Sequence, residues 1–312
     1  MVNEIEFLRK NKFLNHPRIL QVELTTLCPL NCPQCYKDLS GTSELDYSKL
    51  ISLLERQKYV KSVMINGGEP LLYSNFFPLL EKCRSLEIRV FCFTSGVTID
   101  RKQAKALKEY NNLFLNISLN GSVERINKLS RDGYAYAINA IHILKEERTR
   151  FGINWVARHD NIRDFKNVIN LAKAEGANNI LVINNKRSFL NRIDSPVTHN
   201  DILNLAEMIS DHNNRQSTVE IIVQQCFVEL MSVLYGNKHI PLSHGCPSGR
   251  LFCSVNHNME FMPCSHIYSP EKYDSLDDYW HYSEILKRVR NNTLCGAEPF
   301  CVTIGNSKDG GI

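Results

Sequence analysis

Three cysteines lie close together near the start of the chain, at Cys28, Cys32 and Cys35, in the spacing C-x3-C-x2-C. Three thiolates on one short loop can bind three irons of a [4Fe-4S] cubane, whereas most electron carriers bind such a cluster through four cysteines. The fourth iron then keeps an open position, which can chelate the amine and carboxylate of an amino acid. The alternative is a zinc site completed by a distant fourth ligand, although zinc more often takes paired C-x2-C elements.

The chain of 312 residues has eleven cysteines and no N-terminal apolar stretch of the kind that directs export. Because the cytosol keeps thiols reduced, metal or cluster ligation explains this number better than a disulfide framework does. A second group lies toward the C-terminus and consists of Cys246, Cys253, Cys264, Cys295 and Cys301. Cys83 and Cys92 fall within a predicted helix and a predicted strand, where we expect them to pack as small apolar residues.

Short β-rich runs alternate with amphipathic helical patterns from residue 18 onward, which predicts βαβ units and a parallel sheet. The predicted strands are Ile19 to Thr26, Ser62 to Asn66, Ile88 to Thr94, Leu113 to Leu119, Ile153 to Ala157 and Ile180 to Asn184. The predicted helices are Ser48 to Gln57, Phe76 to Ser85, Arg101 to Tyr110, Tyr134 to Glu147, Asp164 to Glu175 and Asp201 to His212. These repeats predict an α/β fold, a partial (β/α)6 TIM-like barrel with functional residues just after the strands.

Two segments that follow predicted strands together resemble the signature of the radical SAM superfamily. They are CPLNCPQCY, which ends at Tyr36, and NGGEP, which contains Gly67, Gly68, Glu69 and Pro70. The resemblance implies a cluster that cleaves S-adenosylmethionine reductively to methionine and a 5′-deoxyadenosyl radical, which then abstracts hydrogen from a substrate. It also implies that the backbone of Tyr36 lies by the adenine and that the GGEP segment receives the methionyl amino group. Two glycines let a backbone approach a ligand closely, and Glu69 could accept from an ammonium or fix the loop.

Four more polar residues match strand-end positions that contact the cofactor in similar enzymes, namely Ser95, Ser118, Asn120 and Arg158. The resemblance implies contacts of the first three with the ribose or the methionyl carboxylate. Arg158 could anchor that carboxylate, because a guanidinium pairs with it bidentately. For each of the four, a turn residue that satisfies local backbone groups is the alternative.

The C-terminal cysteines resemble the auxiliary-cluster region of the SPASM and twitch subfamilies, and the segments QQCFVEL, HGCPSGR and MEFMPCSHIYSP carry the resemblance. Met259 stands where these subfamilies usually have glycine, and the terminal group CGAEPFC is poorer in cysteine than usual. The remaining thiols suffice for one auxiliary [4Fe-4S] cluster. We expect Cys246, Cys253 and Cys264 as ligands, with Cys295 or Cys301 as the fourth. Ordinary buried thiols are the alternative.

Cys226 follows one further predicted strand, Val219 to Gln224, so it lies where the chemistry of a barrel is expected. It could ligate the auxiliary cluster, donate a hydrogen atom to a substrate radical, or simply pack. The sequence leaves these three roles open, and we treat Cys226 as a candidate catalytic residue.

The net charge of +4 is spread along the chain without basic blocks, which gives no support for nucleic-acid binding. No apolar run approaches the roughly 20 residues of a membrane span, so we expect no membrane segment and a cytoplasmic location. The pattern of alternating strands and helices changes near residue 215. We therefore expect a radical SAM barrel over residues 1–215 and an auxiliary iron-sulfur region over residues 216–312.

The SPASM-like tail implies a ribosomally made peptide as substrate, which the enzyme would crosslink or epimerise. Oxidation or rearrangement of a small metabolite such as a sugar or nucleoside is the alternative within enzymes, and a noncatalytic iron-sulfur redox protein is the alternative outside them. The expected partners are an electron donor such as flavodoxin or ferredoxin and a separate leader-peptide-binding protein. The residues before the first strand are too few for a recognition domain, so recognition needs such a protein or the barrel itself.

Overall fold

The computed structural model describes residues 13–37, 39, 41–186, 195–215, 217–236 and 246–291. One sheet holds all strands of these residues, in the order β7-β6-β5-β4-β3-β2-β1-β8-β9. The strands are β1 (Ile19–Glu23), β2 (Ser62–Asn66), β3 (Arg89–Thr94), β4 (Leu113–Ser118), β5 (Phe151–Ala157), β6 (Asn179–Asn184), β7 (Glu220–Val223), β8 (Phe252–Val255) and β9 (Phe261–Met262). Every pairing from β7 to β8 is parallel, and only β8 and β9 are antiparallel.

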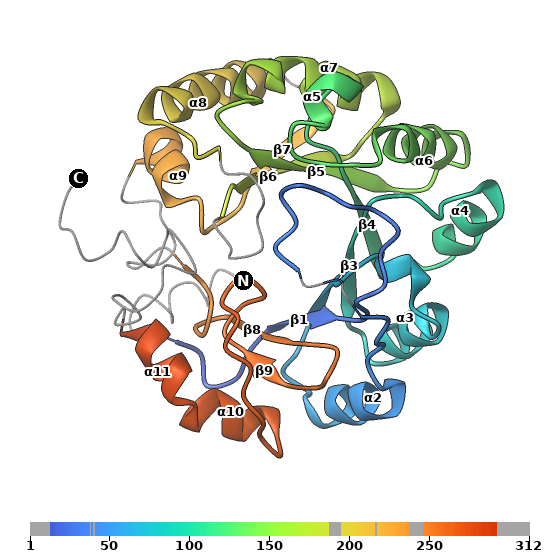
Figure 1. The fold of residues 1–312 in the computed structure, drawn as a ribbon, viewed down its shortest axis with the longest axis vertical. Helices are drawn as coiled ribbons and strands as arrows, with labels where there is room; N and C mark the ends of the chain where they lie inside the picture. Colours follow the sequence, from blue (N-terminus) through green and yellow to red (C-terminus); the bar gives the residue numbers. More distant parts are fainter. Residues whose placement is uncertain are drawn as a thin grey trace.

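Helices cover the outer face of this curved sheet, as Figure 1 shows. They are α2 (Tyr47–Arg56), α3 (Phe76–Ser85), α4 (Arg101–Lys108), α5 (Glu124–Asn127), α6 (Tyr134–Glu146), α7 (Phe165–Glu175), α8 (His199–Asn213), α9 (Val228–Tyr235), α10 (Leu276–Tyr282) and α11 (Glu284–Arg290), with short 3-10 turns at η1 (Pro70–Leu72) and η2 (Ile162–Asp164). The partial barrel predicted from the sequence is confirmed. The six predicted strands correspond to β1 to β6, and Val219 to Gln224 corresponds to β7.

Local chemistry sets several helix starts. The Asp46 and Asp100 side chains accept backbone N–H groups at the N-termini of α2 and α4. Thr198 and Asp201 form a capping box at the start of α8. These contacts satisfy donors that a helix N-terminus otherwise leaves unpaired, and each stabilises the helix by about 1 kcal/mol.

The first strand is shorter than predicted, because the chain turns away after Glu23. Thr25 forms an isolated antiparallel bridge with Glu44, and Thr26 N donates to Ser43 O. The Thr25 hydroxyl also accepts from Leu27 N at 3.0 Å, which fixes the chain as it enters the cysteine loop. A sequence pattern does not show this turn, because its partner segment, Ser43 and Glu44, lies on the far side of the cysteine loop in the chain.

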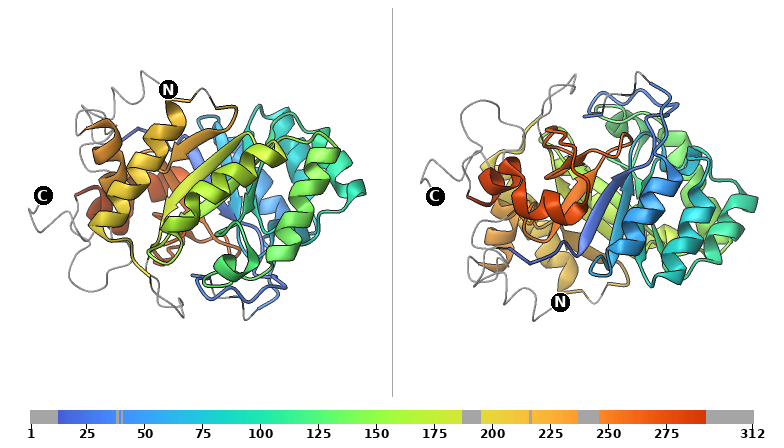
Figure 2. Two further views of the ribbon diagram at one scale, coloured as in Figure 1. Left: turned by 90° about the horizontal axis from the view of Figure 1, so that it is seen from above. Right: turned by 90° about the horizontal axis from the view of Figure 1, so that it is seen from below.

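The C-terminal part of the described chain extends the same sheet at both edges. Strand β7 lies beside β6, and β8 lies beside β1. In the right-hand view of Figure 2, seen from below, the red α10–α11 pair lies next to the blue β1, and the Trp280 indole donates to Leu14 O at 2.8 Å just before that strand. The predicted division at residue 215 stays a prediction. The sheet itself continues across it.

The turn between β8 and β9 contains Met259 with φ of 61°, in the left-handed region. Glycine adopts this conformation without steric cost, and most other residues do not. The backbone at Met259 therefore has the conformation that a glycine would adopt in this turn. None of the described helices has the length and apolarity that a membrane crossing requires.

Candidate functional site

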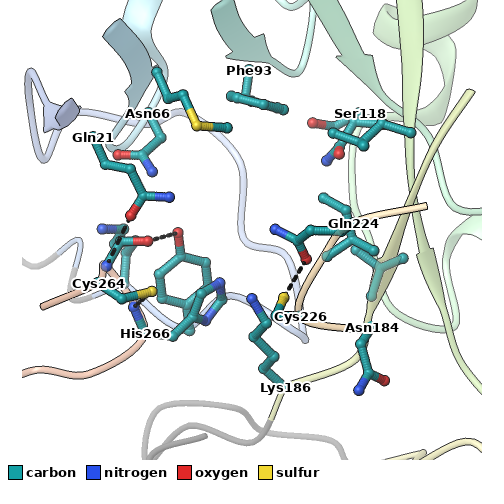
Figure 3. A pocket seen from close by; sticks show the side chains of 18 of the residues that line it. Gln21, Asn66, Phe93, Ser118, Asn184, Lys186, Gln224, Cys226, Cys264 and His266 are labelled. Atoms are coloured by element: carbon teal, nitrogen blue, oxygen red, sulfur yellow. Dashed lines mark hydrogen bonds between the residues drawn. The ribbon is translucent and has the colours of Figure 1, made fainter. Parts of the chain in front are cut away.

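A cavity of about 530 Å³ lies inside the curved sheet, lined by residues within or just after β1 to β7 and by the segments around Cys246, Phe252 and Cys264 (Figure 3). All three loop cysteines line it. Most of the other predicted site residues do so too: Tyr36, Gly67, Gly68, Glu69, Ser95, Ser118, Cys226, Cys246 and Cys264. The strand-end rule for parallel barrels thus brings together segments that are far apart in sequence.

The cysteine loop is braced from the α5–α6 side. Gln34 N donates to Ser130 O at 3.0 Å, and the buried Leu30 side chain packs against Gly133. Within the loop, Cys35 N donates to Cys32 O at 3.1 Å. These contacts hold the three half-buried thiols toward one cavity, which is the arrangement that three corners of a cubane need.

Burial raises the pKa of the Cys28 thiol to about 11; a backbone hydrogen bond from Leu30 opposes the rise, and the Glu69 carboxylate and the two other loop thiols add to it. The thiols therefore lie near enough to repel one another as thiolates. Bound iron would offset this repulsion, since metals bind the deprotonated sulfur. The donor set thus fits a [4Fe-4S] cluster. Within the described ranges, no three His, Cys, Asp or Glu side chains are placed to hold a single metal ion.

The GGEP turn lies directly against the backbone that leads into the cysteine loop. Gly68 N donates to Thr25 O at 2.6 Å, and Glu69 N donates to Leu27 O at 2.7 Å. A Cβ added at Gly68 would lie 2.2 Å from Leu27 O, and one at Gly67 would lie 2.7 Å from Thr25 O. Both glycines are therefore required by close approach of two backbones, and Gly67 also has φ of 137°.

The Glu69 side chain, 1% exposed, fixes this turn to strand β3. One carboxylate oxygen accepts from Thr94 Oγ1 at 2.5 Å and Leu71 N at 3.3 Å, and the other accepts from the backbone N and hydroxyl of Ser95. Four donors fill the acceptor positions of a carboxylate. Of the two roles considered for Glu69, the geometry supports fixing the loop, and Pro70 begins η1 directly behind it.

Asn120 and Arg158 do not line the cavity. The Asn120 amide donates to Gln34 Oε1 at 2.9 Å and Ser130 Oγ at 2.8 Å and accepts from Val156 N at 3.1 Å, so it braces the cysteine loop against β5. Arg158 donates Nε–H and Nη2–H to the two carboxylate oxygens of Asp160, at 3.0 and 2.8 Å. In both cases the observed contacts are those of a residue that satisfies nearby groups of the protein, which is the alternative to cofactor contact.

Asn120→Ala is expected to lower the free energy of unfolding by about 2 kcal/mol, because it leaves buried partners without hydrogen bonds. Urea denaturation of the cluster-free protein measures this, with Ser118→Ala, two residues earlier at the end of β4, as the control. A variant with unchanged unfolding but weakened S-adenosylmethionine binding would instead assign Asn120 a direct cofactor contact.

Tyr36 connects the cysteine loop to the C-terminal region. Its hydroxyl lies 3.3 Å from Ser265 Oγ, and its ring lies 3.9 Å from the His266 ring. Burial raises the pKa of the Tyr36 hydroxyl, which therefore stays protonated at neutral pH. Next along the chain, Lys37 forms a buried ion pair with Glu23. The two ends of the cysteine loop are thus tied together.

The C-terminal cysteines divide between two sides of the sheet. Cys246 and Cys264 line the cavity. Cys253 pairs with Leu20 in the β1–β8 register, and this pair is fully buried, whereas the neighbouring pair Ile19–Phe252 lines the cavity. Because alternate residues of a strand point to opposite faces, Cys253 faces the outer helix layer. Cys295 and Cys301 lie outside the described residues.

Cys226, with a 6% exposed side chain, also lines the cavity. Its thiol donates to Gln224 Oε1 at 3.0 Å, and Figure 3 shows it across the cavity from Cys264. The sequence analysis did not single out Lys186 or Gln224, although both lie where strand-end residues are expected, after β6 and β7. Applying the strand-end rule to every strand would have found them.

Residues 22–172, just under half of the chain, match the sequence profile of the radical SAM superfamily, so this segment is a radical SAM domain. PqqA peptide cyclase of Gluconobacter oxydans is 27% identical over 173 residues, which are 53% of this chain and 48% of the cyclase. Fe-coproporphyrin III synthase of Methanosarcina barkeri is 28% identical over 159 residues, which are 49% of this chain and 40% of the synthase. This chain thus spans about half or less of the length of these relatives.

The fold is similar to that of Streptococcus suis SuiB. The crystal structure of SuiB bound to S-adenosylmethionine gives a TM-score of 0.78 at 18% identity and covers 97% of this chain and 75% of SuiB. The structure of SuiB bound to its precursor peptide SuiA gives a TM-score of 0.75 at 18% identity, over 93% of this chain and 70% of SuiB. At this identity the likeness establishes the fold.

Proposed function

We propose that this chain is a radical SAM enzyme that abstracts hydrogen from a ribosomally made peptide and thereby crosslinks or epimerises it. The observation that carries the proposal is one cavity lined by the three loop thiols, the GGEP turn and a separate polar wall after β6 and β7. When bound, the cluster supplies the electron that cleaves S-adenosylmethionine to methionine and a 5′-deoxyadenosyl radical.

The residues of this chain would bind and orient the reactants. Cys28, Cys32 and Cys35 would hold the cluster, and the GGEP turn would present its backbone to the methionyl amino group. Tyr36 and Ser118 line the cavity, and the backbone of Tyr36 and the side chain of Ser118 would contact the rest of the cofactor. Ser95 and Glu69 would keep the turn in place through the hydrogen bonds between them.

Two relatives support a peptide as substrate. The partly matching PqqA peptide cyclase is named for a peptide, and SuiB, which shares the fold, has been solved with the precursor peptide SuiA. The test is anaerobic incubation of iron-loaded protein with dithionite, S-adenosylmethionine and short peptides encoded beside its gene. We expect 5′-deoxyadenosine and a peptide of changed mass, or of changed stereochemistry on chiral analysis.

Formation of 5′-deoxyadenosine with no change in any peptide would contradict the peptide proposal and favour the second candidate, a small metabolite as substrate. The partial match to Fe-coproporphyrin III synthase supports that candidate. A fully iron-loaded sample that forms no 5′-deoxyadenosine would instead indicate a noncatalytic iron-sulfur redox protein.

An auxiliary [4Fe-4S] cluster is the second metal site that we propose. Cys246 and Cys264 are the ligands that face the cavity, and two of Cys226, Cys295 and Cys301 would complete a set of four thiolates. Cys226 could alternatively donate a hydrogen atom to a substrate radical, because its thiol lies in the wall of the reaction cavity. Loss of iron from Cys226→Ala would assign Cys226 as a cluster ligand, whereas an unchanged iron content would favour hydrogen-atom donation.

Cys253→Ala is expected to keep its full iron content, because its thiol faces the helix layer. Cys246→Ala and Cys264→Ala are the matched variants, and each is expected to lose iron equivalent to one cubane, about four atoms per chain. Iron and sulfide analysis with Mössbauer spectroscopy measures the difference. If Cys253→Ala lost as much iron as Cys264→Ala, Cys253 would be a ligand, as the sequence suggested.

The proposed partners follow from this chemistry. An electron donor such as flavodoxin or ferredoxin would reduce the cluster, and a separate protein could bind a leader segment of the substrate. The cytoplasm, where thiols stay reduced, is the proposed location.

A further inference from the structure

Strand β7 ends the curved sheet on one side and has an open edge. On its other side it pairs with β6, where Glu220 N and Gln224 N donate to backbone carbonyls at 3.0 and 2.9 Å. In a parallel strand the N–H and C=O of one residue point to the same side, and those of the next residue point to the opposite side. Ile221 and Val223 therefore direct their backbone groups away from β6.

These backbone groups of Ile221 and Val223 have no hydrogen-bond partner in the part of the chain that the structure describes. The edge at the opposite end of the sheet is covered, since Phe261 on β9 and Glu271 exchange backbone hydrogen bonds at 2.8 and 2.9 Å. Proteins usually protect a bare edge with proline, lysine or a covering segment. After Glu220 the sequence of β7 is entirely apolar, with neither proline nor lysine. Its edge is therefore suited to accept another strand.

The open edge of β7 borders the cavity that holds the cysteine loop. Ile222 pairs with Leu181 and both line the cavity, whereas Val223 pairs with Val182, which is fully buried and does not line it. Because alternate residues of a strand point to opposite faces, the Val223 side chain points away from the cavity. Val223 nevertheless lines the cavity, so its backbone is the part that the cavity reaches.

The same cavity continues past this edge to the other end of the sheet. Leu251 and Phe252, at the start of β8, line it together with Ile222. In the described residues, the sheet has no strand beyond β7 that would separate the two. Figure 3 shows Gln224, directly after β7, beside the Cys226 thiol. A chain that lay along β7 would therefore lie within the cavity where the chemistry is expected.

We propose that the peptide substrate binds in extended form, as an added strand along the open edge of β7. The N–H and C=O groups of Ile221 and Val223 would bond to the peptide backbone, which is how several peptide-binding domains hold an extended ligand. This inference rests on the proposed peptide function and adds the way in which the peptide is held. Because side chains alternate along a strand, residues two positions apart in the peptide would face the cavity.

The test compares three synthetic libraries of random seven-residue peptides that differ only in backbone N-methylation. One library is unmethylated, one is methylated at every second residue, and one is methylated at every residue. Each N-methyl group removes a donor and blocks the edge that carried it, so alternate methylation leaves one edge of an extended peptide free and full methylation leaves none. Mass spectrometry quantifies the peptides that iron-loaded protein retains in the presence of S-adenosylmethionine.

We expect the alternately methylated library to be retained within about twofold of the unmethylated one, and the fully methylated library to be retained about tenfold less. A tenfold change corresponds to about 1.4 kcal/mol, which is the net contribution of one or two hydrogen bonds.

Val223→Pro tests the edge of the protein in the same way. It removes an N–H that points away from β6, so it breaks no hydrogen bond of the sheet. We expect this variant to keep its iron and to retain about fivefold less of the unmethylated library. Val223→Ala is the matched control, because it shortens the side chain but keeps the N–H, and it should retain more peptide than Val223→Pro.

Equal retention of the unmethylated and fully methylated libraries would overturn the inference and leave the peptide function standing. Equal loss of both methylated libraries would also overturn it, because strand addition at β7 needs only one edge of the peptide. Unchanged retention by Val223→Pro would do the same, and if that variant loses its iron the comparison of libraries decides. Retention of no unmethylated peptide by the unmodified chain would overturn the peptide function and this inference with it.

Discussion

Simultaneous replacement of Cys28, Cys32 and Cys35 by alanine is expected to remove about four iron atoms per chain and to abolish 5′-deoxyadenosine formation. The reason is geometric, because the three thiols of one braced loop line the cavity and would supply three corners of a single cubane. Removing one thiol could leave a partial cluster, so the triple variant gives the larger and clearer loss. Iron analysis and electron paramagnetic resonance of the reduced protein measure the effect.

The matched control is Cys83→Ala. Cys83 is fully buried on α3, does not line the cavity, and burial raises the pKa of its thiol to about 12. This variant should keep its iron and its 5′-deoxyadenosine formation. If the triple variant retained the iron of the unmodified chain, the loop would not be the cluster site, and the proposed function would fail with it.

Gly68→Ala has the second largest expected effect, a loss of about 3 kcal/mol or more in the free energy of unfolding together with poor iron incorporation. The added Cβ would lie 2.2 Å from Leu27 O and 2.6 Å from Leu27 C. These are backbone atoms at the entrance to the cysteine loop, so they cannot swing aside as a flexible side chain can. Relief of the overlap must displace the loop itself.

Gly176→Ala separates this overlap from an ordinary glycine effect. Gly176 has φ of 72° at the end of α7, and an added Cβ there meets nothing within 4 Å. Its substitution should cost about 1 kcal/mol from backbone strain and leave iron content unchanged. Both variants are compared by denaturation of the cluster-free protein and by iron analysis after reconstitution. Equal effects of the two would show that Gly68 has no special role at the loop.

Sequence patterns predicted the barrel and the centre of the site because both depend on local signals. The strands are β-rich runs between amphipathic helices, and the GGEP and cysteine segments follow β2 and β1 directly. The parallel arrangement then brings those two segments together. This reasoning needs only element order, which the sequence carries.

The same reasoning does not decide which way a side chain points. Arg158 follows β5 as expected, and its Nε–H and Nη2–H groups donate to Asp160, two residues away. Cys253 lies on a four-residue strand that the sequence analysis did not detect, and its pairing with Leu20 turns it outward. A shift of one position along a strand reverses the face, so spacing between cysteines cannot reveal it.

The pairing of β8 with β1 has a consequence for how the protein is made. Strand β1 leads into the cysteine loop, yet one of its two neighbours is separated from it by more than half of the described chain. When the first seven strands have been synthesised, the edge of β1 that will pair with β8 is therefore still unpaired. The edge of β1 is therefore covered only once translation has delivered the segment around Cys253.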